Sequence, residues 1–293
     1  MVLIYLKEKE LYSILIILLF VSGVFFGDAY ADSSAASLSP TRIAIAANER
    51  SASVTLRNTS KTEVAYRMDL IEMGLNANGL FGALKDDELH PEQRSAKKIV
   101  RFSPRQVRLK PGASQVVRVI VRRGGLAAGE YRSHMRLEAL PVLSGSDLLD
   151  SEGNNPVLVN SSSSANVGVT IPVIVRHSDT DATVTLEKST VVLNRSGSGG
   201  RVNLQLALSG NRSAFGDFSV SLINGRKEET IAELKGFALY YPYPRENVFI
   251  NIKRGISQSR FNSNSRIRVK FKNKAADSNK VYWMDEVSVP VIQ

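Results

Sequence analysis

The feature that most constrains this chain is a two-residue alternation of apolar and polar side chains that recurs along most of its length. Clear examples lie at 53–57, 201–206 and 266–272, where every second residue is apolar. Successive side chains of a strand point to opposite faces, so this period indicates strands with one buried and one solvated face. No long segment has the 3.6-residue period of an amphipathic helix. The sequence therefore predicts an all-β protein.

Turn signals such as Lys110-Pro111-Gly112 and Asn78-Gly79 separate the predicted strands. About seven strands precede residue 178 and about seven follow it, which is the strand number of an immunoglobulin-like sandwich twice over. We therefore predict two β-sandwich domains, at 32–178 and 179–293, joined by the polar link 177–181.

Two polar stretches of the first domain are predicted to be loops. Most of Leu75 to Lys98 is irregular, and Ser144 to Asn166, between the sixth and seventh strands, is rich in Ser, Asn, Asp and Gly. A connection as long as the second is either functional or a floppy surface loop, and both interpretations stay open.

The N-terminal residues predict export. A short charged start with Lys7 and Lys9 leads into an apolar run at 11–26, and Ala29-Tyr30-Ala31 follows. This is the pattern of a secretory signal peptide, so we predict that residues 1–31 are cleaved after Ala31 and that the mature protein lies in the periplasm without stable membrane insertion. The alternative is a retained membrane anchor, for which the apolar run is short.

The composition narrows the chemistry. The net charge of +10 suggests that the partner is acidic, a membrane surface or a nucleic acid. The alternative is that the charge only keeps the protein soluble. The predicted export argues against nucleic acid. There is no cysteine, which excludes thiol catalysis and zinc–thiolate sites. His90, His134 and His177 are widely spaced, Ser213 lies outside a nucleophile elbow, and no phosphate-binding loop is present. We predict no enzyme, no metal and no cofactor.

An ordered set of segments carries a resemblance to a known family. The segments are Leu38-Ser39-Pro40-Thr41-Arg42-Ile43, Phe102-Ser103-Pro104, Val107 to Gly112, Gly129 to His134, Ile171 to Arg176 and Gly210 to Asp217. In order and spacing they resemble the periplasmic chaperones of the chaperone–usher pilus pathway, over about residues 36 to 293. The resemblance implies two immunoglobulin-like domains joined at an angle. It also implies a chaperone that caps pilus or fibre subunits and delivers them to an outer-membrane usher. The alternative is a structural or adhesive periplasmic protein with the same fold.

The seventh strand is the predicted donor strand. Val167, Val169, Ile171 and Val173 share one face, with Val157 and Val159 as a possible extension. Pro172 cannot donate a ladder hydrogen bond, so this strand is predicted to lie at a sheet edge. The resemblance implies that the strand completes a partner's sandwich by β-augmentation. The alternative is that these residues belong to the core of their own domain.

The resemblance also implies two basic anchors for the terminal carboxylate of a subunit. Arg42 matches the first, and a guanidinium fork suits a planar carboxylate. The second anchor falls on Pro172, so the usual pair is incomplete. Arg176 matches a position that forms an ion pair between the domains. Its acidic partner stays unassigned, because the nearest candidate, Glu138, is one residue off and a one-residue shift reverses the face of a strand.

Two further features have two interpretations each. Tyr131, just after Gly129, is either the corner tyrosine of an immunoglobulin-like sandwich or an ordinary half-buried aromatic residue. The alternate bases Arg266, Arg268, Lys270 and Lys272 form either a solvated outer face or a docking patch.

Overall fold

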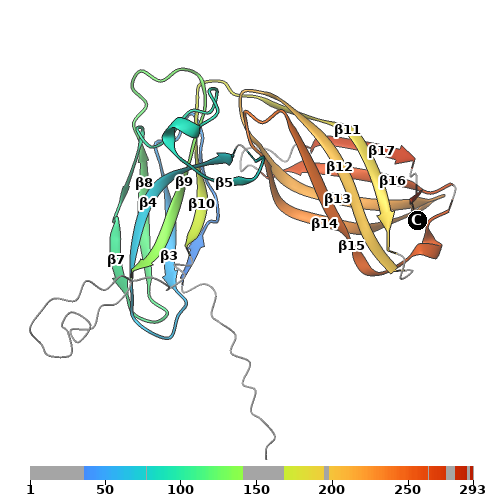
Figure 1. The fold of residues 1–293 in the computed structure, drawn as a ribbon, viewed down its shortest axis with the longest axis horizontal. Helices are drawn as coiled ribbons and strands as arrows, with labels where there is room; N and C mark the ends of the chain where they lie inside the picture. Colours follow the sequence, from blue (N-terminus) through green and yellow to red (C-terminus); the bar gives the residue numbers. More distant parts are fainter. Residues whose placement is uncertain are drawn as a thin grey trace, which may run out of the picture.

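The computed structural model describes residues 36–76, 78–140, 168–194, 198–262 and 264–274, and the backbone of 281–288 and 291–292. The predicted signal peptide, Val157, Val159, Val167 and the stretch Ser144–Asn166 lie outside the described residues. The described chain forms two β-sandwiches joined at an angle, which confirms the all-β prediction (Figure 1). The first ends with the strand that stops at His177, and the second begins with the strand that starts at Ala182.

The first sandwich pairs two sheets. One has the order β1 (Ala36–Ser39), β3 (Ser51–Asn58), β8 (Ser114–Val121) and β6 (Val100–Ser103). The other has the order β2 (Ile43–Ile45), β10 (Val169–His177), β9 (Gly129–Leu140), β4 (Val64–Leu75) and β5 (Phe81–Leu84), with β7 (Gln106–Leu109) also paired to β4. The predicted first strand is thus split, because β1 joins one sheet and β2 joins the other.

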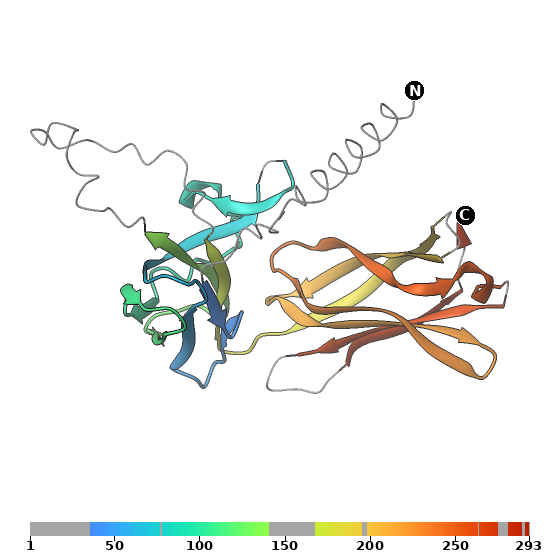
Figure 2. The same ribbon diagram turned by 90° about the horizontal axis from the view of Figure 1, so that it is seen from below.

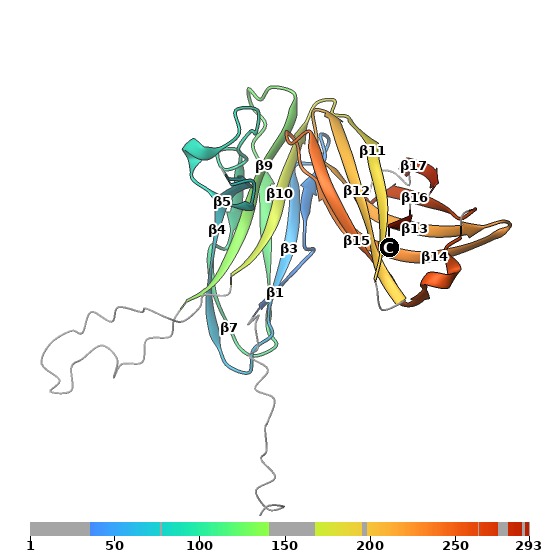
Figure 3. The same cartoon turned by 45° about the vertical axis from the view of Figure 1, so that its right-hand side comes forward.

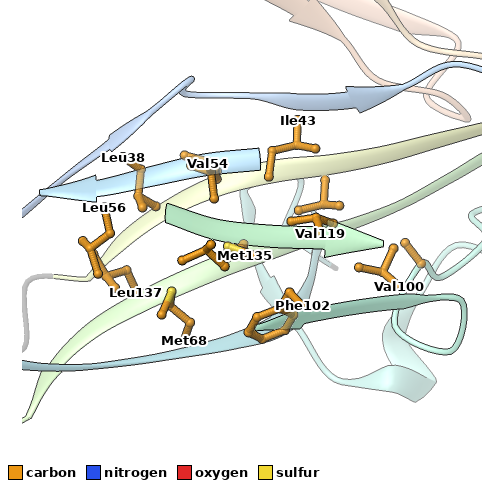
Figure 4. Packing of buried hydrophobic residues seen from close by; sticks show 14 of the residues in the cluster. Leu38, Ile43, Val54, Leu56, Met68, Val100, Phe102, Val119, Met135 and Leu137 are labelled. Atoms are coloured by element: carbon orange, nitrogen blue, oxygen red, sulfur yellow. The ribbon is translucent and has the colours of Figure 1, made fainter. Parts of the chain in front are cut away.

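The core of the first domain lies between these sheets and is built by the alternation seen in the sequence. Val54 and Leu56 on β3 are fully buried, and they face Met135 and Leu137 of β9 across the sandwich (Figure 4). Burying a branched aliphatic side chain of this size contributes about 1.5–3 kcal/mol, so the inward rows of both sheets hold the domain together.

Most of Leu75 to Lys98 lies outside regular strands, as predicted, but the stretch contains one strand that the sequence analysis did not foresee. Residues Phe81–Leu84 form β5, a hairpin partner of β4, and a short 3-10 turn, η1 (Asp86–Glu88), follows. Gly79, with φ of 72°, makes the turn between the strands. The sequence analysis missed this strand because only one of its four residues, Leu84, is buried. That is too short a run for a period to show.

The second sandwich is formed by one continuous sheet that folds over on itself. Its strands are β11 (Ala182–Leu193), β12 (Ser198–Gly210), β13 (Ala214–Asn224), β14 (Lys227–Leu239), β15 (Arg245–Ser257), β16 (Arg266–Asn273), β17 (Val281–Ser288) and β18 (Val291–Ile292), with η3 (Gln258–Arg260) after β15. The sheet order is β17-β16-β13-β14-β15-β12-β11-β18. Strands β11, β12 and β15 lie in one layer and β13, β14 and β16 in the other (Figures 2 and 3).

The basic row on β16 points away from the core of this second sandwich. The intervening residues Ile267, Val269 and Phe271 are buried, whereas the bases are exposed or half-buried. Arg268 is already engaged, because its guanidinium donates to the Glu228 carboxylate of β14. These features favour a solvated outer face. Within the described ranges, no helix is long and apolar enough to cross a membrane.

Candidate functional site between the domains

The predicted donor strand, β10, is an edge strand over only part of its length. It pairs with β9 from Val169 to His177, and on its other side β2 pairs in parallel with Val173–Val175 alone. No described strand pairs with residues 169–172 on that side. Pro172 stands in this open stretch, where a missing backbone donor is tolerated. The edge prediction therefore holds for the first half of β10 and is wrong for the second.

The apolar row of β10 faces the core of its own domain. Ile171 is 2% exposed and Val173 is fully buried, and both belong to the core between the sheets. Val169 is partly buried and packs against that core. The interpretation of Ile171 and Val173 as core residues is the one that the burial supports. An inward-facing side chain of a two-layer sandwich cannot enter a partner without leaving a cavity behind.

Arg42 lies on the short link between β1 and β2, at the boundary with the second domain. Its guanidinium carbon stands 4.4 Å from the ring centre of Phe215 and 5.8 Å from that of Tyr240, which are cation–π distances. Its buried Nη2 has no hydrogen-bond partner among the described residues. Burial lowers the pKa of Arg42, with a further contribution from the positive charge of Arg176. The predicted anchor is thus a desolvated guanidinium that packs against two aromatic rings, those of Phe215 and Tyr240.

A second guanidinium, which the sequence analysis did not single out, contacts one of the same aromatic rings. Arg132 on β9 is 2% exposed, and its guanidinium carbon stands 4.2 Å from the ring centre of Tyr240. Its Nη2 donates to Oε1 of Gln93 at 2.9 Å, while Nε and Nη1 have no partner among the described residues. Burial lowers the pKa of Arg132. Its sequence signal is weak, because an alternate base on a strand ordinarily indicates a solvated face.

His134 follows two residues later on the same face of β9. It is 3% exposed, and the rings of Phe81 and Tyr240 stand edge-on to it at 6.0 and 6.1 Å. Burial, together with the charges of Arg132 and Arg42, lowers its pKa from 6.5 to about 3. The imidazole is therefore neutral near pH 7. No group of described residues could hold a metal ion.

Arg176 finds its acidic partner in Glu130, not in Glu138. Arg176 and Glu130 both belong to the first domain, so the expectation of an ion pair between the domains is wrong for this pair. Arg176 and Glu130 lie opposite each other across the β9–β10 ladder, and Nε is 3.8 Å from the carboxylate. Both are nearly buried. Glu138 instead contacts Arg67 at 2.9 Å and Arg136 at 3.2 Å on the same sheet. Register, which residue spacing alone does not specify, makes this choice.

The Glu130 carboxylate also joins the two domains. It accepts a hydrogen bond from the backbone N–H of Ser213 at 3.0 Å and another from the Ser213 hydroxyl. Around the interface, Tyr243 accepts from the N–H of Leu75 at 2.9 Å, and the Tyr241 hydroxyl donates to Glu92 at 3.1 Å. Phe81 stacks on Tyr240 at 5.4 Å, so the β4–β5 hairpin reaches the second domain (Figure 1). The interface between the domains is therefore formed by hydrogen bonds and aromatic contacts.

The charge balance of this interface is uneven. Arg42, Arg132 and Arg176 meet a single buried carboxylate, that of Glu130, which already serves Ser213 and Arg176. Arg42 and Arg132 form no ion pair with any described residue. Among the residues that the structure describes, Glu130 is thus the one buried carboxylate that acts on both Arg42 and Arg132, and it also pairs with Arg176. Buried cations that share one counter-charge are costly, so the arrangement favours a further anion. We call Arg42, Arg132, Tyr240 and Phe215 the arginine–aromatic site.

Tyr131 is the corner tyrosine that one of the two interpretations predicted. Its hydroxyl donates to the carbonyl oxygen of Ala127, four residues upstream, at 3.0 Å. This backward bond to the preceding backbone is the mark of that motif. The guanidinium of Arg94 covers its ring at 5.5 Å.

No family model and no curated protein sequence matches this chain. Solved structures of pilus chaperones do. The CupB2 chaperone of Pseudomonas aeruginosa is 12% identical, with 86% of this chain and 100% of that chain covered and a TM-score of 0.41. The CsuC chaperone of Acinetobacter baumannii, solved with its tip adhesion subunit CsuE, is 13% identical, with coverage of 89% and 100% and a TM-score of 0.41. The class 5 fimbriae chaperone CfaA is 12% identical, with coverage of 86% and 98% and a TM-score of 0.41.

Proposed function

We propose that this protein is an exported, non-enzymatic chaperone that binds pilus or fibre subunits and presents them to an outer-membrane usher. The observation that carries the proposal is the pairing of two binding features at one place. The desolvated guanidinium of Arg42, whose Nη2 has no partner among the described residues, lies next to a strand whose first half has an open edge. One feature suits a terminal carboxylate, and the other suits an extended backbone.

The open edge at residues 169–172 supplies the backbone part of the mechanism. An unpaired strand edge normally promotes aggregation, and proteins cover or blunt it. A subunit whose own sandwich lacks a strand can pair with this edge and so bury its exposed groove. Val169, half-buried at the start of β10, is the described side chain placed to follow the backbone into the partner. Val167 is proposed to act with it.

The carboxylate anchor supplies the register. A strand that adds by backbone hydrogen bonds alone can slip by two residues without losing its facing pattern. Fixing the end of the partner's chain at Arg42 removes that freedom, because the guanidinium lies at one end of the open edge. No nucleotide is needed, since binding and release only exchange one strand partner for another.

A photo-crosslinker at Thr170 tests the strand mechanism in the exported full-length protein. The matched control is the same crosslinker at Val116, which is 55% exposed on the other sheet. We expect Thr170 to crosslink a secreted, strand-deficient immunoglobulin-like protein, identified by mass spectrometry, and Val116 to crosslink it far less. Equal crosslinking from both positions, or none from Thr170, would contradict strand donation.

The variant Arg42→Ala tests the anchor. If the partner's carboxylate is desolvated there, the loss of binding is roughly 2–5 kcal/mol, and if the pair is exposed it is under about 1 kcal/mol. The control is Arg67→Ala, a solvent-facing arginine of the same sheet. If the protein is instead a structural or adhesive protein of the same fold, it should be exported normally, but no subunit should co-purify with it in a complex that Arg42→Ala weakens.

A further inference from the structure

We propose that Arg132 supplies the second guanidinium of the site that binds the partner's terminal carboxylate, in place of a base at position 172. This inference rests on the proposed function and deepens it, because it names the second half of the anchor. Sequence spacing leaves the anchor incomplete at Pro172. The sheet places a buried arginine one strand away.

The strand register shows how the replacement works. Ile43 of β2 pairs with Val173 of β10, so Arg42, one residue earlier, lies beside Pro172. Across β10, Pro172 pairs with His134 of β9, and Ile174 pairs with Arg132. Since alternate residues of a strand share a face, Arg42, Pro172, His134 and Arg132 all lie on the face that points away from the core. Arg132 therefore stands on the same surface as Arg42.

The burial pattern confirms which face this is. Ile174 is fully buried, yet it does not belong to the core cluster that contains Ile171, Val173 and Val175. On this same face, Phe215 of the second domain contacts Arg42 and Tyr240 contacts Arg132. The face that carries the two arginines is thus the interface face, not an open surface.

Both arginines have nitrogen donors without a partner among the described residues, and these donors could bind one anion together. Arg132 has unpaired Nε and Nη1, and Arg42 has an unpaired Nη2. Nε and Nη1 of Arg132 point to different sides of its guanidinium, and Nη2 is bonded to Gln93, so Arg132 offers an anion one donor at a time. Arg42 then supplies the donor for the second oxygen of a carboxylate. Tyr240 contacts both guanidinium groups and holds their orientation. Because Arg42 is half-buried and Arg132 is covered, an entering anion meets Arg42 first.

A carboxylate fits these surroundings better than a more highly charged anion. The rings of Tyr240, Phe215 and Phe81 line the site, and the negative charge of Glu130 acts on both of its arginines. A planar group with a single charge matches the few free donors and the apolar walls. The end of a peptide chain that has paired with the open edge of β10 brings such a group to this place.

The rival role for Arg132 is purely structural, as a plate stacked on Tyr240 that holds the domains together. A change in stability would not separate the two roles. The two roles are separated by comparing ligands with a charged and an uncharged C-terminus, because an arginine that only stacks on Tyr240 would not bind one more tightly than the other.

The test uses the full-length mature protein and an N-acetylated octapeptide of alternating valine and threonine, prepared with a free C-terminal carboxylate or as the C-terminal amide. We expect the free acid to bind about tenfold more tightly than the amide. Arg132→Gln and Arg42→Gln should each reduce that ratio to about two or less, and Arg132→Lys should restore part of it. The matched control, Arg136→Gln, alters the same face of β9 at an arginine already bonded to Asp69, and should keep the ratio.

An independent readout is the Nε–H resonance of Arg132 in ¹⁵N-labelled protein, assigned with Arg132→Lys. It should shift with the free acid and not with the amide. A ratio that survives Arg132→Gln but falls in Arg42→Gln overturns the role of Arg132 and leaves the proposed function standing. Equal binding of acid and amide overturns the carboxylate site while strand pairing stands. Binding of neither peptide overturns the inference, and crosslinking at Thr170 then decides separately whether the proposed function fails with it.

Discussion

The carboxylate of Glu130 in the first domain accepts a hydrogen bond from the backbone N–H of Ser213 in the second, at 3.0 Å. The Ser213 hydroxyl donates to the same carboxylate and accepts from the N–H of Tyr241 at 3.0 Å. Glu130 is 4% exposed and Ser213 is fully buried. A charged acceptor with directional donors in a dry environment costs several kcal/mol to disrupt, so this contact sets how the two sandwiches meet.

Replacing Glu130 with Gln should weaken the junction. The amide keeps the shape, but it turns one acceptor into a donor that faces donors and leaves Arg176 without a counter-charge. We expect a loss of about 2–4 kcal/mol in the free energy of unfolding by urea, and a wider spread of domain orientations in X-ray scattering. Glu138→Gln, on the same strand but partly exposed, is the control and should cost under about 1 kcal/mol. Equal losses in the two variants would contradict a special role for Glu130.

Replacing Gly74 with Ala should disturb the same junction from the β4 side. A Cβ at Gly74 would lie 2.2 Å from the Tyr243 hydroxyl oxygen and 2.9 Å from Leu84. The tyrosine must then move and give up its hydrogen bond with Leu75, at a cost of about 1–2 kcal/mol. The control is Gly82→Ala, because Gly82 pairs with Gly74 across the hairpin and a Cβ there meets nothing. Thermal unfolding should show destabilisation for the first variant and none for the second.

The buried His134 should make the protein less stable in acid. Its pKa is lowered from 6.5 to about 3 in the folded state, so between these values the unfolded chain binds a proton that the folded protein does not. The stability is highest above about pH 6.5 and falls as the pH drops toward 3, by roughly 5 kcal/mol in all.

His134→Gln removes this titration. The positive groups Arg42 and Arg132 face the ring and keep their charge throughout, and Glu130 is common to both proteins. The difference in unfolding free energy between the original protein and the variant should therefore shrink steadily between pH 7 and pH 4. A difference that does not depend on pH would show that the pKa of His134 is the same in the folded and the unfolded protein.

Two neighbouring positions of β10 should respond differently to a buried charge. Ile171→Asp places a carboxylate in the core of the first domain and should unfold it, at a cost of several kcal/mol. Val169→Asp, at the half-buried start of the strand, should leave the protein folded by circular dichroism while it abolishes crosslinking to the subunit from Thr170. A folded Val169→Asp protein that still captures the subunit fully would remove Val169 from the proposed donor surface.

The exported protein should begin at Asp32. Ala29 and Ala31 occupy the two small-residue positions of a signal peptidase site. N-terminal sequencing of protein from a periplasmic extract measures this directly, and Ala31→Leu should slow processing. An intact Met1 on the exported protein would favour the membrane-anchor alternative.

Much of the fold could be predicted from local sequence, because alternation and turn chemistry act over a few residues. The inward rows at Val54 and Leu56, or at Ile267 and Val269, are buried as their period predicts. The corner role of Tyr131 also follows from its nearby glycine and its place in the strand. Arg42 could be singled out only because the ordered segments resemble a family in which that position matters.

Tertiary structure alone decided the composition of the site. Arg132 reads as an ordinary outward base until the second domain covers its face with Tyr240, and Glu130 becomes the partner of Arg176 only through the register of β9 and β10. The pairing of β2 with half of β10 likewise depends on where the first strand changes sheets. A sequence pattern states which way a side chain points relative to its neighbours in the chain. What lies opposite that side chain is chosen by strand register and domain packing, which join residues more than 80 positions apart, such as Glu130 and Ser213.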